Sequence, residues 1–216
     1  MGRFFSSNNI LFRASERIMD VCVLSLMWLL CSLPVLTIVP ASSALYYSCV
    51  KCLRRGEKGP YVNFLRAFRD NLKTGIAASA VFLLLAAVLV WFNLMLARLA
   101  PVQAQIAYLV LMLLPVGALT CTSALLSRFS STLGSLLQDA ARITVGHLPR
   151  VAAAAVLNAL TALICVRYAL FLVWIFLPAT DALLVSRLLE PVLKKYTPGY
   201  EEYADVPLEE RPWYLR

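Results

Sequence analysis

Residues 28–51, WLLCSLPVLTIVPASSALYYSCVK, decide the fold class of the chain. They lie inside an uncharged run of 30 residues, from 21 to 50, that includes Pro34 and Pro40. A single membrane-crossing helix needs about 20 apolar residues. The run is therefore too long for one simple crossing and too short for two full ones.

The two prolines predict that this run folds as a bent hairpin. A proline inside a helix removes a backbone donor and clashes with the preceding turn. We expect a helix over residues 19–33, a break around Pro34–Pro40, and a shorter helix over residues 42–53 that returns to the side where the run began. Ser42 or Ser43 is the expected N-cap of that second helix. We interpret these serines as caps and not as nucleophiles.

The composition indicates an integral membrane protein. Of the 216 residues, 61% are hydrophobic and 15% are charged, and the mean hydropathy is +0.75. A soluble domain has about 25% charged residues. Further uncharged runs cover residues 74–97, 99–127, 151–166 and 168–180. We predict an all-α polytopic membrane helix bundle of five to six membrane segments, including the proline-broken N-terminal hairpin, as a single transmembrane helical domain over residues 1–196.

The positions of lysine and arginine predict the topology. Seven of them lie in residues 51–73, whereas only Arg98 separates the second uncharged run from the third. Because short basic loops stay in the cytoplasm, we expect both termini and the 51–73 loop to lie inside a multi-pass protein of the cytoplasmic membrane. Topology then accounts for the net charge of +8, and we expect no nucleic-acid partner.

The last two uncharged runs allow two interpretations. Residues 151–166 and 168–192 would form a hairpin with Arg167 near the outer surface, which keeps the basic C-terminal portion inside. The alternative is one long tilted helix over residues 151–177, which would put the tail outside and bury Arg167. Residues 197–216 contain five acidic residues, and we predict that they form a cytosolic extended acidic tail.

Two stretches, near residues 4–19 and 61–73, are predicted to be interfacial helices. In the second stretch, two phenylalanines recur four residues apart while basic side chains face elsewhere. Such helices place an aromatic face at the acyl boundary and cations near anionic headgroups, so we expect the lipid bilayer as a partner. Docking of a cytosolic partner is the alternative. The candidate membrane-surface contacts are Arg66, Arg69, Lys73, Phe64 and Phe68.

Asp181 is the ionisable residue that most suggests a function. In the hairpin topology it lies ~16 Å above the inner end of the last helix, from eleven residues at the helical rise. An intramembrane carboxylate is costly and is by default a functional hypothesis. Asn158, at comparable depth on the preceding helix, is a candidate hydrogen-bond partner. Alternatively, Pro178 ends the crossing and Asp181 caps an interfacial helix.

No motif predicts catalysis or metal binding. Cys49 and Cys52 form a CxxC without a second pair, in an apolar segment, and free cysteines are commonly buried. His147 is the only histidine, whereas a zinc site takes three or four protein ligands. We therefore expect no enzyme activity, no catalytic or cofactor-binding residue, no cofactor and no metal.

Four stretches together resemble the YesL-like family of uncharacterised bacterial integral membrane proteins. They are LMWLLCSLPVLTIVPASSALYY (26–47), FLRAFRDNLKTG (64–75), HLPR (147–150) and LLEPVLKKY (188–196). The resemblance implies a multi-helix bacterial membrane protein encoded beside sugar-uptake and carbohydrate-degradation genes. It implies no activity and no catalytic residue.

Two functions follow from these observations. The first is an accessory or structural membrane component of carbohydrate uptake or utilisation, with a sugar-uptake transporter complex as its partner. The second is a small-solute or cation-coupled transporter or channel that uses Asp181 and Asn158. Pathway polarity separates the two, because a transporter lines its cavity with several convergent polar groups.

Overall fold

The computed structural model describes residues 10–99, 101–129, 132–167 and 171–196, and within these ranges the chain is helical without a strand. The predicted all-α class is confirmed. In chain order the elements are α1 (Ile10–Ser32), the 3-10 helix η1 (Val35–Thr37), α2 (Ile38–Ser48), the π-helix η2 (Cys49–Arg54), α3 (Pro60–Asp70), α4 (Leu72–Leu99), α5 (Val102–Leu111), α6 (Leu113–Leu126), α7 (Leu133–Gly146), α8 (Leu148–Arg167) and α9 (Phe171–Lys195).

Among the described residues, three helices are long and apolar enough to cross a membrane. They are Val35–Arg54, Leu72–Leu96 and Leu148–Arg167, and Leu113–Leu126 is a shorter apolar helix. These helices indicate a membrane protein. The first span is 61% buried inside the protein and the second only 17%, so Val35–Arg54 is an interior helix whereas α4 is covered by few other helices.

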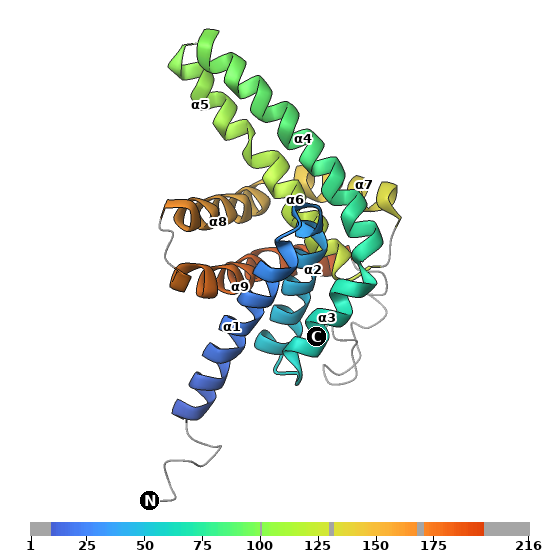
Figure 1. Cartoon of the computed structure of the whole chain (residues 1–216). Coiled ribbons are helices and arrows are strands. Elements are labelled where there is room, and N and C mark those ends of the chain that lie inside the picture. Colours follow the sequence, from blue (N-terminus) through green and yellow to red (C-terminus); the bar gives the residue numbers. More distant parts are fainter. Residues whose placement is uncertain (1–9, 100, 130–131, 168–170, 197–216) are drawn as a thin grey trace, which may run out of the picture.

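The opening run folds as the predicted hairpin, because α1 ends at Ser32 and α2 runs back alongside it (Figure 1). The expected start of the second helix was wrong. It begins at Ile38, so Pro40 lies in its first turn. Proline is tolerated there because a first-turn amide has no partner within the helix.

Ser42 and Ser43 are not N-caps, since both lie inside α2. Ser42 Oγ accepts a hydrogen bond from Trp28 Nε1 at 3.1 Å, and Ser43 Oγ accepts one from Asn71 Nδ2 at 3.4 Å. The two serines therefore join α2 to α1 and to the junction of α3 and α4.

A serine from α4 performs the expected capping role for α2. Ser79 Oγ accepts the first-turn amide of Val39 at 3.1 Å. The two helices also approach closely, because a Cβ added to Gly75 would lie 2.7 Å from Pro40 Cβ. Beyond this contact α4 leaves the bundle and returns as α5, so the two helices form a projecting arm (Figure 1).

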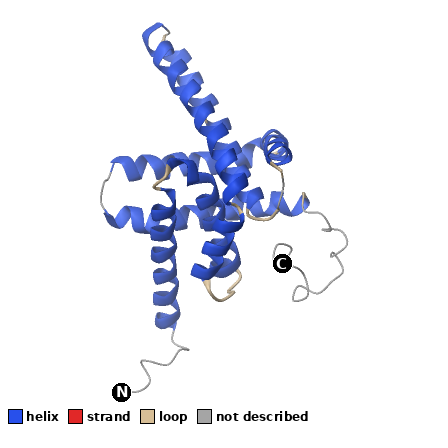
Figure 2. Ribbon diagram, turned by 45° about the vertical axis from the view of Figure 1, so that its right-hand side comes forward, coloured by secondary structure: helices blue, strands red, loops and turns tan. Residues whose placement is uncertain are grey.

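The last two helices form the predicted hairpin. α8 ends at Arg167, α9 begins at Phe171, and the two lie side by side and run across the α1–α2 hairpin (Figures 1 and 2). The alternative of one long helix over residues 151–177 is wrong. A close approach also joins α6 to α8, where a Cβ on Gly117 would lie 2.5 Å from Val151 Cγ1.

Pro178 does not end the last crossing, because α9 continues through both Pro178 and Pro191. The backbone next to Pro178 is held from outside the helix. The amide of Ala179 donates to Ser25 Oγ of α1 at 3.1 Å. Side chains of neighbouring helices commonly satisfy the backbone around a proline in this way.

α3 has the amphipathic pattern predicted for residues 61–73, but its aromatic face points into the protein. Phe64 is 0% exposed and packs with Leu24, Leu45 and Ala179. Phe68 is partly buried against the same cluster. The expected lipid contact of Phe64 is therefore wrong, because α1, α2 and α9 cover that face.

The predicted membrane-surface cations Arg66, Arg69 and Lys73 are exposed. Their contact with headgroups stays a prediction. A separate helix near residues 4–19 is not observed, because α1 is continuous from Ile10 to Ser32, and residues 4–9 and 197–216 lie outside the described ranges.

Candidate functional site

A cavity lies where α1, α2, α6, α8 and α9 meet, and we call it the central cavity. Its volume is about 420 Å³, and its wall is mainly apolar. The aromatic lining residues are Trp28, Tyr46 and Trp174. The other side chains with polar atoms or a thiol are Ser42, Thr120, Ser123, Asn158, Thr161, Cys165 and Asp181.

Helical spacing brings these side chains to one wall. On α9 the lining residues are Trp174, Pro178, Asp181, Ala182 and Val185, and on α8 they are Asn158, Ala159, Thr161, Ala162, Cys165 and Val166. Intervals of three and four residues place side chains on one face of a helix. The α8–α9 hairpin therefore gives both of its inward faces to the cavity.

Asp181 lies in the middle of α9, and its residue is 9% exposed. Its carboxylate hydrogen-bonds the side chain of Thr161 on α8. The interpretation of Asp181 as a helix cap is therefore wrong, because no helix begins near it. A buried carboxylate with a neutral partner in an apolar wall is an uncommon arrangement, since transfer of a charge from water is costly.

Asn158 lines the same cavity but does not make the expected bond to Asp181. Its Nδ2 donates to the Ala154 carbonyl at 2.9 Å and to Thr120 Oγ1 at 3.4 Å. The sequence analysis thus identified two residues that line one cavity, but the hydrogen bond that it predicted between them was wrong. Thr120 and Thr161, which had no distinguishing pattern in an apolar sequence, complete the polar part of the wall.

Tyr46 joins the central cavity to a second polar site. It is 4% exposed and lines the cavity. Its hydroxyl donates to Glu190 Oε1 at 3.3 Å, and this bond links α2 to α9 across 144 positions in sequence. One side chain therefore borders the solute-sized cavity and a buried ionic cluster.

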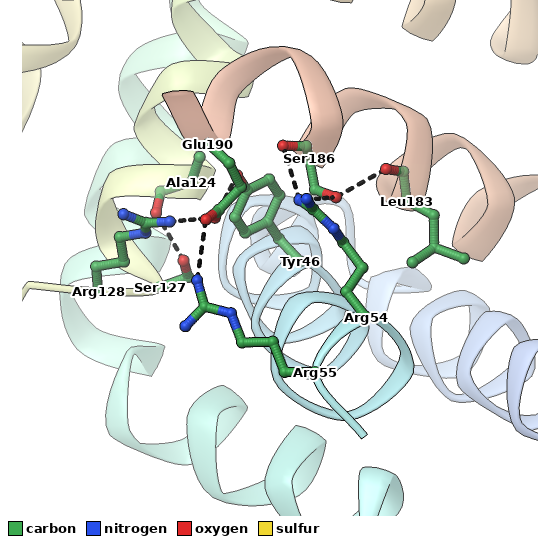
Figure 3. A network of polar contacts seen from close by, with 9 residues as sticks. All are labelled: Tyr46, Arg54, Arg55, Ala124, Ser127, Arg128, Leu183, Ser186 and Glu190. Carbon is green, nitrogen blue, oxygen red and sulfur yellow. Dashed lines mark hydrogen bonds and ion pairs between the residues drawn. The ribbon is translucent and has the colours of Figure 1, made fainter. Parts of the chain in front are cut away.

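We call this second site, which consists of Glu190 and the charged side chains around it, the Glu190 cluster. Figure 3 shows Arg55 and Arg128 directed at Glu190, and Arg54 directed at Ser186 one turn away on α9. Arg55 Nη2 lies 3.2 Å from Glu190 Oε2, and Arg128 forms an ion pair with Oε1. Arg54 Nη1 donates to Ser186 Oγ at 3.2 Å and to its carbonyl at 3.1 Å.

The sequence interpretation missed this cluster. The available signal was a single glutamate inside the apolar stretch LLEPVL, residues 188–193. An ionisable residue in such a segment marks a candidate site whose partner must be found elsewhere in the chain. The partners lie 62 to 144 positions away, so local spacing could not identify them.

The other reactive residues lie apart from the central cavity. His147 Nε2 is 3.4 Å from the Tyr196 hydroxyl, and neither residue lines the cavity. Cys49 and Cys52 are both free thiols, and they are 0% and 7% exposed. In the part of the chain with described structure, no group of three or more His, Cys, Asp or Glu side chains could hold a metal ion.

Comparison with known proteins gives one similarity. Searches of curated proteins and of solved structures return no match. Residues 21–94 match a family model described as "Protein of unknown function, DUF624". This match covers α1 from Val21 through most of α4, including Trp28, Ser42 and Tyr46 of the cavity, and it does not reach α8 or α9. Over residues 21–94 the chain is thus similar to an uncharacterised family, DUF624.

Proposed function

We propose that this membrane protein binds a small solute in the central cavity. One observation carries the proposal: Asp181 and Asn158 line the same cavity of about 420 Å³ with five further side chains that carry a hydroxyl or a thiol, which are Ser42, Thr120, Ser123, Thr161 and Cys165. Cavities that hold small ligands have volumes of about 300–1,000 Å³, apolar walls and a few convergent polar groups. This pattern favours the solute-binding function over a purely structural one.

The wall chemistry favours an amphipathic solute with hydroxyl groups or a cation. Asp181 accepts hydrogen bonds or pairs with a positive charge, while Asn158 and Thr161 offer donors and acceptors. The rings of Trp28 and Trp174 offer apolar faces. The resemblance to the YesL-like family makes carbohydrates the first solute class to test, and it is part of this proposal that the protein acts in bacterial carbohydrate uptake or utilisation.

An accessory role beside a sugar-uptake transporter is the second candidate. The supporting observation is the α4–α5 arm, which projects from the bundle (Figure 1) and exposes Leu84, Trp91 and Phe92 by 71%, 63% and 51%. A partner membrane protein would pack on this arm where lipid otherwise would. Co-purification of such a transporter, lost on replacement of Trp91 and Phe92 by alanine, would support this role.

We propose a binding role without catalysis, in the bacterial cytoplasmic membrane, with the η2–α3 side in the cytoplasm. The distribution of lysine and arginine supports this orientation. In a variant without native cysteines, a cysteine at Lys58 or Gln138 should be protected from an impermeant thiol reagent in intact cells. A cysteine at Gln103 should be labelled. Labelling of position 58 from outside would contradict the orientation.

The binding test uses purified full-length protein in nanodiscs and a panel of monosaccharides, disaccharides and quaternary ammonium ions. We expect one class to quench or shift the fluorescence of the tryptophans in a saturable way. Ala162→Trp fills the cavity and should abolish this response. Ala153→Trp, on an exposed face of the same helix that does not line the cavity, is the matched control.

Asp181→Asn separates the two solute classes. It preserves shape and removes the charge, so a cation should lose most of its affinity, whereas a sugar should lose several-fold. No response to any probe, or equal responses from the Ala162→Trp and Ala153→Trp variants, would contradict binding in this cavity.

A further inference from the structure

The Glu190 cluster carries more positive charge than its carboxylate balances. Arg55 and Arg128 both contact Glu190. Lys194 lies within electrostatic reach of Glu190, and Arg54 lies within electrostatic reach of both Arg55 and Lys194. Within the described residues, these four cations and the one carboxylate sum to a local charge of +3. Buried or half-buried charges of one sign are unstable without a counter-ion, so this excess requires an explanation.

Arg128 shows where the missing counter-charge would act. Its side chain is 0% exposed, and Glu190 is 5% exposed. One guanidinium nitrogen, Nη2, contacts Glu190, whereas Nε and Nη1 have no hydrogen-bond partner in the part of the chain that the structure describes. A buried unsatisfied group usually indicates a water or an ion that belongs to the site.

The pKa values of Lys194 and Arg55 indicate the same excess of positive charge. Burial and then the nearby Arg55 lower the pKa of Lys194, and Glu190 does not offset them. Burial also lowers the pKa of Arg55, with further contributions from Arg128 and Arg54, despite the attraction of Glu190. Both groups lie beyond the apolar spans, in a positive potential.

The cations of the cluster differ in exposure. Arg54 is exposed, Lys194 is half-buried, the Arg55 side chain is 15% exposed, and Arg128 lies beneath them. In the proposed orientation Arg54 and Arg55 lie at the cytoplasmic end of the span Val35–Arg54, where η2 ends. An anion can therefore reach the more exposed cations, Arg54 and Lys194, from water or from the headgroup layer.

We propose that the Glu190 cluster binds a phosphate group, with Arg54, Arg55 and Lys194 at its mouth and Arg128 at its floor. A phosphate offers several acceptor oxygens and one to two negative charges, and arginine guanidinium groups match that geometry. It supplies acceptors for Arg128 Nε and Nη1 and a negative charge beside the cations. The phosphate belongs either to a free anion or to an anionic lipid headgroup.

Glu190 is the internal competitor of this ligand. It occupies one nitrogen of Arg128 and one of Arg55, and its negative charge repels an incoming phosphate. Removal of this charge should therefore strengthen phosphate binding even though it removes stabilising ion pairs. If the cluster were only a structural set of ion pairs, removal of the Glu190 charge would lower stability without strengthening phosphate binding.

The test measures the thermal unfolding of purified full-length protein in a neutral detergent as inorganic phosphate is added at constant ionic strength. We expect a saturable rise in Tm that sodium chloride does not reproduce. Glu190→Gln should have a lower Tm without phosphate and a larger rise with it. Lys194→Gln and Arg54→Gln should weaken the apparent affinity by about two- to fivefold each, from partly exposed charge pairs.

Arg142→Gln is the matched control, because the Arg142 side chain is 68% exposed on α7 and forms an ion pair with Asp139 of the same helix. It should leave the phosphate response unchanged. If Glu190→Gln does not fold, the comparison of Lys194→Gln and Arg54→Gln with Arg142→Gln decides the proposal. Equal responses from these three variants, or the absence of a response from wild type to both phosphate sources, would overturn it.

Reconstitution distinguishes the two sources. Nanodiscs of phosphatidylcholine alone are compared with nanodiscs that contain phosphatidylglycerol. A rise in Tm with phosphatidylglycerol, reduced in Lys194→Gln and absent with inorganic phosphate, identifies a lipid headgroup. A rise with inorganic phosphate in both membranes identifies a free phosphate-bearing anion.

Discussion

Gly75→Ala is predicted to destabilise the protein although alanine is the better helix former. The added Cβ would lie 2.7 Å from Pro40 Cβ, 2.8 Å from Cδ and 3.0 Å from Cγ. Carbon atoms pack at about 3.5–4.0 Å, so α2 and α4 must separate by roughly 1 Å. The proline ring has no rotamer that could move aside.

The magnitude follows from two opposing terms. Overpacking of a tight contact destabilises the protein by about 1–3 kcal/mol, whereas replacement of glycine by alanine inside a helix stabilises it by about 1 kcal/mol. The separation would also stretch the bond between the Val39 amide and Ser79 Oγ, now 3.1 Å, which adds about 1 kcal/mol. We expect a net loss of about 1–3 kcal/mol.

Gly134→Ala is the control for this substitution, because a Cβ at Gly134 in the first turn of α7 would meet nothing within 4 Å. It should be neutral or stabilising by up to about 1 kcal/mol. The assay is thermal unfolding in one detergent, with each variant compared with wild type. A Gly75→Ala protein as stable as the Gly134→Ala protein would refute the close approach of α2 and α4.

Three further substitutions test other parts of the fold. Ser25→Ala removes the side-chain acceptor of the buried Ala179 amide and should cost about 1 kcal/mol, measured as a lower Tm, whereas Ser25→Thr should retain most of the stability. Asp20→Asn should lower the pKa of Tyr61, which the hydrogen bond at 2.6 Å and burial raise to about 12; difference absorbance at 295 nm against Tyr61→Phe measures it. The bond to Asp20 favours the protonated phenol of Tyr61, so its contribution to stability is complete below about pH 10, the pKa of an unperturbed tyrosine. This contribution is lost as the pH rises through the pKa of Tyr61 in the folded protein. A Tm difference between wild type and Asp20→Asn that grows above pH 10 would contradict this expectation.

The sequence predicted those features that depend on local chemistry. Pro34 stops α1 near the expected place, and the charge of Arg167 correctly separates two apolar runs into a hairpin. The amphipathic pattern around Phe64 correctly predicted a helix. These results rest on backbone donors, helical periodicity and the cost of a charge in an apolar run, which act over a few residues.

The sequence did not reveal which partner covers each face. The aromatic face of α3 was assigned to lipid, whereas Leu24 and Ala179 cover Phe64, and apolar side chains suit either environment. The capping of α2 by Ser79 spans 40 positions. Likewise, the bond of Asp181 to Thr161 depends on the register between two helices, which composition does not specify.

The bond between Ser25 and Ala179 spans 154 positions, and it has a consequence for biosynthesis. The ribosome makes α1 and α2 before it makes α9, the segment that covers them. Until α9 arrives, Arg54 and Arg55 lack their partners on Ser186 and Glu190. The contact between α1 and α9 therefore forms only after α9 is made. A chain cut before residue 179 would leave the α1–α2 hairpin uncovered, as a substrate for membrane quality-control proteases.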